Sequence, residues 1–272
     1  MTPTTIPDGG WPRWRLVAIL ATVALTALAL LTGLALALWP ILNTTPTTAV
    51  TLPSPGRGAV HDVAYRDRIA AEPMLQVPDS AASTPEVSTA TAPPLKVPAS
   101  DAVGPANVAT GFPHTPAGAV GQLAAIEVRV VQAMSIPAAH QVHDAWALPG
   151  AVSAPQWEMT GDVQVFLTTL AGQGQAMDGS IVVTATPAAG LVKGTDGPDW
   201  VVACVLLDVQ ADVLTHAEIG YGHCERMAWQ GDRWMIAPGT PPAAAPSVWP
   251  GSDLALKAGW RTWVTAPAGH RG

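Results

Sequence analysis

The chain lacks the short motifs that mark common catalytic and nucleotide-binding sites. It has no G-x-S-x-G segment for a serine nucleophile, no P-loop, no G-x-G-x-x-G loop and no paired-carboxylate signature. The acidic segment KGTDGPDW, residues 193–200, lacks the ligand spacing of an EF-hand and predicts a turn. We therefore expect no cofactor, and no motif indicates an enzyme.

Basic residues are also scarce. The 20 Asp and Glu residues outnumber the 13 Lys and Arg residues, which gives a formal net charge of −7. Because an acidic surface repels phosphate backbones, direct binding of nucleic acid is not expected.

Cysteine is nearly absent, since Cys204 and Cys224 are the only two. A structural zinc site needs three or four ligands, and no C-x-x-C or H-x-x-x-H grouping supplies them. Zinc is therefore the weaker alternative, and we predict no metal site. In an oxidising compartment the pair is expected to form a disulfide.

One long apolar run determines where the chain is expected to lie. Residues 16–38 contain no charged side chain, and as a helix they would cross the ~30 Å hydrocarbon core of a bilayer. Arg13 and Arg15 precede the run, and the next basic residue is Arg57. The positive-inside rule then predicts a single-pass membrane protein with a cytoplasmic tail, residues 1–15, and an extracytoplasmic remainder.

A cleaved signal peptide is the alternative to this anchor. Its apolar region is normally only about 7–15 residues long, so the uncleaved transmembrane helix is favoured.

Residues 39–110 are rich in Pro, Thr, Ser and Ala, and they predict a flexible stalk. A short helix is expected over 64–74, ending at Pro73. A partner-binding strip within the stalk is the alternative to a plain spacer.

A folded domain is predicted over 111–240, and it begins with helices. Thr115 is placed to cap the first helix, with Pro116 in its first turn. Shorter helices are expected over 137–147 and from Pro155 to Gly172. Apolar side chains recur on one face of the first helix, whereas Gln122, Arg129 and Gln132 fall on the other. The apolar positions are Ala119, Leu123, Ile126, Val130 and Met134.

Strands follow the helices. Residues 180–186, 200–210, 216–229 and 233–237 are rich in β-branched and apolar residues, with turns between them. Trp229 and Trp234 flank one tight turn and are expected to pack across it. Helices followed by antiparallel strands predict an α+β domain in which the helices pack on a curved sheet.

The two cysteines predict the register of the central hairpin. If Cys204 lies opposite Cys224, then Val205 faces His223 and Leu207 faces Tyr221. This register aligns the apolar faces of both strands, and a slip of one residue would separate them.

His223 and Glu225 then fall on the otherwise apolar face of their strand. If that face lines a cavity, the pair could transfer protons, because a buried carboxylate beside an imidazole shifts both pKa values. If the strand end is solvated, they are ordinary polar residues. We keep His223 and Glu225 as catalytic candidates, although a solvated strand end is the simpler interpretation. His140 and His143 are interpreted as solvated surface residues, with metal binding as the alternative.

The last segment, 241–272, begins as a Pro/Ala connector, and Ser252 is placed to cap a short helix after it. Trp249, Trp260 and Trp263 either dock on the sheet or bind a partner or another copy of the chain.

The order of one span, a stalk and an outer domain of helices then strands resembles the TcpC-type bitopic subunits of conjugative, type IV secretion channels. Segments 111–126, 192–209 and 220–239 also resemble actinobacterial proteins of conjugative elements. The resemblance implies an outer domain with a nuclear transport factor 2-like (cystatin-like) cone fold. It also implies channel proteins, the cytoplasmic membrane or further copies of the chain as partners, and it carries over no catalytic residue.

Two classes of function are therefore expected. The first is a non-enzymatic, membrane-anchored scaffold of a transfer apparatus. The second is a small-molecule-binding or enzymatic cone with His223 and Glu225 in a pocket. An accessory protein of the cell envelope, unrelated to conjugation, is a third alternative.

Overall fold

The structure is a computed structural model, and it describes residues 61–170, 174–177, 181–212 and 216–267. The predicted cytoplasmic tail and transmembrane helix, residues 1–15 and 16–38, lie outside the described residues. Among the described helices, none is long and apolar enough to cross a bilayer. The following paragraphs concern the unit Pro55–Gly272 alone.

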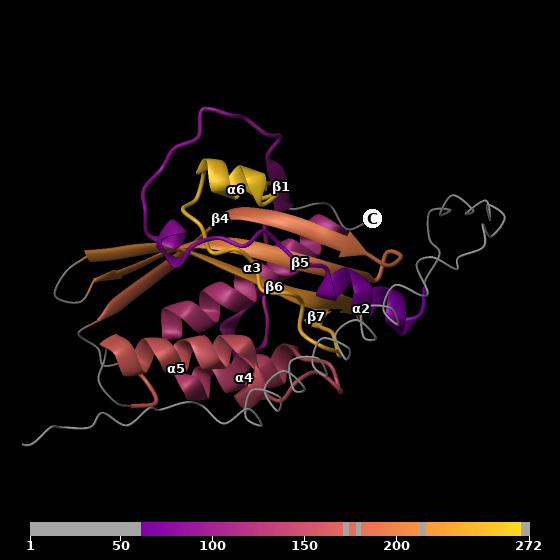
Figure 1. Cartoon of the computed structure of the whole chain (residues 1–272). Coiled ribbons are helices and arrows are strands. Elements are labelled where there is room, and N and C mark those ends of the chain that lie inside the picture. The colour runs from indigo at the N-terminus through magenta and orange to yellow at the C-terminus, as the bar shows by residue number, and fades with distance from the viewer. Residues whose placement is uncertain (1–60, 171–173, 178–180, 213–215, 268–272) are drawn as a thin grey trace, which may run out of the picture. The chain divides into compact units, whose positions relative to one another are not determined.

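Three helices pack against one face of a strongly curled, mostly antiparallel sheet, which confirms the α+β prediction (Figure 1). The sheet has six strands in the order β1-β8-β4-β5-β6-β7, and only β1 and β8 pair in parallel. The helices are α3 (Pro116–Ala133), α4 (Ile136–Trp146) and α5 (Glu158–Leu170). The strands are β1 (Leu95–Pro98), β4 (Val182–Thr195), β5 (Trp200–Asp212), β6 (His216–Gln230), β7 (Arg233–Ile236) and β8 (Arg261–Ala266).

Helix α3 forms as its sequence predicts. The Thr115 hydroxyl accepts a hydrogen bond from the Gly118 amide at 3.1 Å, and Pro116 occupies the first turn. All five residues of the apolar stripe are buried. Gln122 is an exception to the predicted solvent face, because the small hairpin β2 (Ala102–Val103) and β3 (Ala109–Thr110) covers it. Its amide donates to the Ala109 carbonyl at 3.0 Å.

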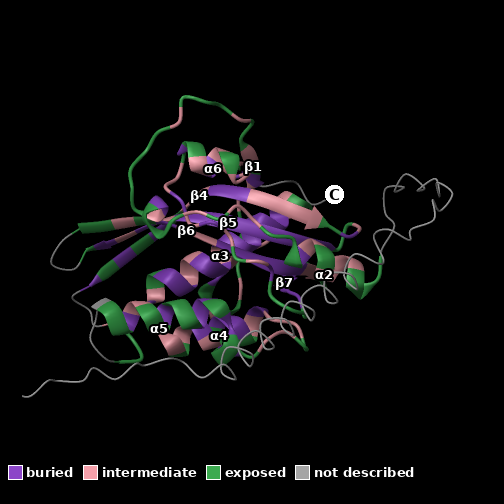
Figure 2. Cartoon of the chain, viewed as in Figure 1, coloured by how far each residue is buried: buried purple, intermediate pink, exposed green. Residues whose placement is uncertain are grey.

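The predicted register of the central hairpin is confirmed. Cys204 pairs with Cys224 and is joined to it by a disulfide, and Leu207 pairs with Tyr221. The side of β5 that includes Leu207 packs against the helices, whereas the side that includes Cys204 belongs to a second core on the convex face. Nearly all of β5 is therefore buried on both sides (Figure 2). Strand β4 extends beyond the predicted segment 180–186 to Thr195, and it is interrupted by two register shifts.

The prediction of a flexible stalk over 39–110 is wrong for residues 61–110, and residues 39–60 lie outside the described residues. Helix α2 (Val63–Ala71) packs on the convex face, and β1 adds to the sheet beside β8. Ala70, Val97 and Val108 have no exposed surface. Composition misleads here because these few apolar side chains extend a core built by the rest of the chain, and so they need no core of their own.

Helix α2 is also held by charge. Asp196, which is 1% exposed, accepts hydrogen bonds from the His61 amide at 2.7 Å and from the Arg66 guanidinium at 2.6 Å. These bonds lower the pKa of Asp196 even though its burial acts in the opposite direction.

The C-terminal segment docks on the convex face. Trp260 is 1% exposed, and its indole nitrogen donates to the Pro246 carbonyl at 3.1 Å, so it is a core residue and not a partner-binding one. Ser252 caps helix α6 (Asp253–Lys257) as predicted, and the chain then continues as strand β8. Trp249 and Trp263 are half-buried.

Glycines on β6 permit this docking. A Cβ at Gly222 would lie 2.7 Å from the Pro246 carbonyl oxygen, too close for any side chain. The Gly222 amide instead donates to the Ser247 hydroxyl at 3.0 Å. The connector therefore lies directly on the backbone of β6.

Replacing Cys204 and Cys224 together by alanine tests the contribution of the disulfide. The bond closes a loop with a sequence separation of 20, for which chain entropy predicts a loss of roughly 3 kcal/mol in the free energy of unfolding. Chemical denaturation of the full chain, oxidised, reduced and doubly substituted, measures the loss. Equal stability of the three forms would contradict this assignment.

Candidate functional site

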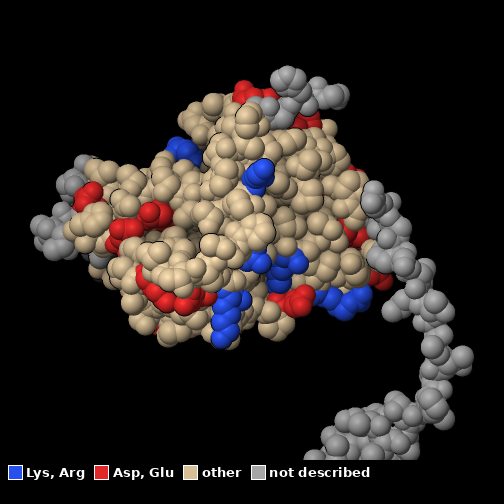
Figure 3. Space-filling model, turned by 90° about the horizontal axis from the view of Figure 1, so that it is seen from above, with Lys and Arg blue, Asp and Glu red and all other residues tan. Residues whose placement is uncertain are grey.

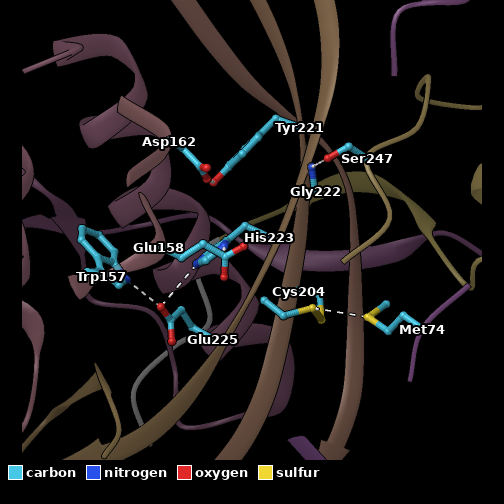
Figure 4. Close-up of polar contacts among 11 residues, drawn as sticks. Met74, Trp157, Glu158, Asp162, Cys204, Tyr221, Gly222, His223, Glu225 and Ser247 are labelled. Carbon is cyan, nitrogen blue, oxygen red and sulfur yellow. Dashed lines mark hydrogen bonds and ion pairs between the residues drawn. A yellow bond between two sulfur atoms is a disulfide. The ribbon is translucent and has the colours of Figure 1, made fainter. Parts of the chain in front are cut away.

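A cluster of ionisable side chains lies between the helices and the concave face of the sheet (Figure 4). Tyr221, His223 and Glu225 alternate along β6 and so point to the same face. Helix α5 brings Glu158 and Asp162, which are one turn apart, to this face.

His223 and Glu225 are close together, as the catalytic hypothesis requires. His223 Nε2 lies 3.3 Å from Glu225 Oε1, and the same oxygen accepts a hydrogen bond from Trp157 Nε1 at 2.6 Å. His223 Nδ1 lies 3.8 Å from Glu158 Oε2. His223 is only 2% exposed and Glu225 only 7%. Both residues are therefore interior groups, which excludes the interpretation that the strand end is solvated.

Glu127 is a further member that the sequence reasoning missed. It has no exposed surface, and neither carboxyl oxygen has a hydrogen-bond partner within the described chain. Burial raises its pKa well above the usual value, although the nearby His223 opposes this shift. The sequence did indicate that Glu127 is buried, because position 127 lies on the apolar face of α3, four residues after Leu123 and three before Val130.

The imidazole of His223 is stabilised in its charged form. Burial disfavours the charge, but the hydrogen bond to Glu225 and the negative charges of Glu225, Glu127 and Glu158 outweigh it, and the pKa rises to about 9. Burial likewise raises the pKa of Glu158, with His223 opposing the shift. At neutral pH the centre is thus an imidazolium held by Glu225.

A cavity of about 410 Å³ opens next to this cluster, between α5, the end of α3 and the strands β5 and β6. Tyr221 and Asp162 belong to its lining, and the Tyr221 hydroxyl donates to Asp162 Oδ2 at 2.6 Å. His223 and Glu225 do not line it. Tyr221 also contacts the buried pair, because its ring stacks on His223 at 6.2 Å between centroids. The cavity and the buried pair are therefore neighbours but not one open site.

The remaining candidates are placed as follows. His143 is 4% exposed and packs on Trp157, so the prediction of a solvated residue is wrong for it. Its Nδ1 lies 3.7 Å from Asp144, beyond hydrogen-bond distance, and His140 is half-buried. In the described part of the chain, no three His, Cys, Asp or Glu residues are grouped to hold a metal ion.

Trp229 and Trp234 pair across the β6–β7 turn, as predicted, with their rings edge to face at 5.5 Å. His114 stacks on Trp229 at 4.4 Å and lies 2.7 Å from Asp199. This group lies at the start of α3 and at the β6–β7 turn, and it makes no hydrogen bond or ion pair to His223 or Glu225 among those of the described residues.

Comparisons with family models, curated proteins and solved structures find no match to this chain. The site is therefore interpreted from its geometry alone.

Substituting Glu225 by glutamine tests the charged state of His223. The amide retains an acceptor for Trp157 but removes the charge, so the pKa of His223 should fall from about 9. The pKa of His223 is about 9 in the folded chain and about 6.5 in the unfolded chain, so protonation of His223 stabilises the fold. The full stabilisation is present below about pH 6.5. This stabilisation, about 3 kcal/mol, is lost as the pH rises through about 9. Glu225→Gln should lose less unfolding free energy than the unsubstituted chain over the same pH range.

Titration of the histidine ring signals by NMR, with His223→Gln to assign the signal, measures the pKa. Chemical denaturation between pH 6 and pH 9.5 measures the stability. Glu218→Gln is the matched control, because it changes another glutamate of β6 that faces His216. A His223 signal that titrates near pH 6.5 in the unsubstituted chain would contradict the assignment.

Proposed function

We propose that this chain is a non-enzymatic, membrane-anchored scaffold of a conjugative, type IV secretion-like apparatus. In this proposal residues 16–38 cross the cytoplasmic membrane once, and residues 1–15 lie in the cytoplasm. The described domain lies outside and binds channel proteins or further copies of the chain.

The observation that carries the proposal is the layout of the described domain. Three helices precede four antiparallel strands that curl around them, which is the arrangement expected of a nuclear transport factor 2-like outer domain. The Cys204–Cys224 disulfide supports an oxidising location outside the cytoplasm.

The burial of the ionisable cluster favours a scaffold over an enzyme that uses His223 and Glu225. A general acid or base must come within hydrogen-bond distance of its substrate. Both side chains are buried, and neither lines the cavity. A substrate bound in the cavity would therefore not contact the pair directly.

The predicted topology is tested with single introduced cysteines. Val87 is 87% exposed in the described domain, so Val87→Cys should react with a membrane-impermeant maleimide on intact cells. Thr4→Cys, in the predicted cytoplasmic tail, should react only after the cells are permeabilised. The native cysteines do not interfere, because they are joined to each other. Labelling of Thr4→Cys on intact cells would contradict the orientation.

The scaffold role is tested by deleting the gene in its host and measuring conjugative transfer. Transfer should be lost and should return with the full chain. In the deletion strain, the Trp249→Ala and Trp263→Ala chains should reach the normal protein level but should not restore full transfer, if these half-buried residues contact partners.

Trp260→Ala is the contrasting variant. It leaves a cavity in the convex core and is expected to cost about 3–5 kcal/mol of stability, so it should lower the protein level itself. Normal transfer in the deletion strain would refute the proposed function.

A further inference from the structure

The cavity beside Tyr221 has the size and lining of a small-molecule site. Its volume of about 410 Å³ lies within the range of roughly 300–1,000 Å³ that is typical of such sites. Its walls are almost entirely apolar, with Met159, Val163 and Phe166 from α5 facing Val209 from β5.

Apolar side chains also reach the opening of the cavity. Val165 and Ile219 both belong to the lining, yet they are 64% and 42% exposed. Exposed apolar residues at the mouth of an apolar cavity favour the entry of an apolar molecule over that of water.

The polar groups of the lining can accept hydrogen bonds far better than they can donate them. The Tyr221 hydroxyl already donates to Asp162, and the Thr169 hydroxyl already donates to the Val165 carbonyl at 2.8 Å. An ionised carboxylate offers about four acceptor positions, and Tyr221 uses one of those on Asp162. A ligand head that approaches Asp162 must therefore bring the hydrogen.

The charge around the cavity is mainly negative, although His216 pairs with Asp212 and Glu218 at the strand ends and His223 lies behind Tyr221. Among the described lining residues none is Lys or Arg, and Asp162 is ionisable. Glu158 lies one turn before Asp162, and Asp212 and Glu218 lie on the adjoining ends of β5 and β6. Figure 3 shows Asp and Glu gathered on the side toward which these strand ends project in Figure 1. An anionic head would be repelled, whereas a cation would be attracted and could also contact the Tyr221 ring.

We propose that this cavity binds an amphiphilic amine, with its apolar body between α5 and the β5–β6 hairpin and its ammonium group on Asp162 beside Tyr221. This site is independent of the proposed scaffold function, because it needs neither a membrane anchor nor a protein partner.

A matched set of probes tests the head group. Phenylbutylamine, phenylbutanol and phenylbutanoate share one apolar body and differ in charge. Isothermal titration of the full chain in lipid nanodiscs, with empty nanodiscs as the blank, should give the tightest binding for the amine and the weakest for the carboxylate. If the chain does not associate with nanodiscs, it is titrated directly in buffer, so failure of the anchor and failure of the cavity are distinguished.

Variants locate the binding. Asp162→Asn should weaken binding of the amine about tenfold and leave that of the alcohol nearly unchanged, because it removes the charge and keeps the shape. Asp212→Asn is the matched control, since it removes one exposed acid of the same hairpin that does not line the cavity, and less than a twofold change is expected. Ala217→Phe should abolish binding of all three probes by filling the cavity.

The melting temperature of each variant is compared with that of the unsubstituted chain, so that loss of fold is not mistaken for loss of binding. Equal binding of amine and carboxylate, an unchanged affinity in Asp162→Asn, or no binding of any probe would overturn the proposal.

Discussion

The pairing of β5 with β6 is the constraint on which the rest of the domain depends. Once Cys204 lies opposite Cys224, every side chain of both strands is assigned to one face of the sheet. Tyr221, His223 and Glu225 then face the helices, and Gly220, Gly222 and Cys224 face the opposite side. A slip of one residue would bury the connector against ionisable side chains and turn the glycines toward α5, so neither face would pack.

This register brings charge into the interior, and the fold offsets the cost by pairing. Moving an unpaired ion out of water costs several kcal/mol, so a buried charge persists only with a partner or becomes neutral. His223 and Glu225 are paired with each other, and Trp157 donates a second hydrogen bond to the shared Glu225 oxygen. Glu127 has no hydrogen-bond partner in the described chain, and its burial accordingly raises its pKa well above the usual value.

The sequence was sufficient wherever a local pattern determined the structure. The cap at Thr115, the stripe of α3, the cysteine register and the Trp229–Trp234 pair all follow from spacing along one or two neighbouring elements. It was insufficient where contacts join segments far apart in the chain. The packing of α2 depends on Asp196, more than a hundred residues later, and the burial of Trp260 depends on glycines of β6. Glu127 differs, because its place on the apolar stripe of α3 already indicated burial, and only its neighbours on β6 and α5 required the structure.

The cavity and the buried cluster share Tyr221, and this joins two features that the sequence could not connect. Tyr221 lines the cavity and donates its hydroxyl to Asp162, and its ring also stacks on His223. Asp162 and Glu158 are one turn apart on α5, so a shift of that helix would change both contacts together. The strand register that faces His223 and Glu225 toward the helices thus also places Tyr221 in the wall of the cavity beside them.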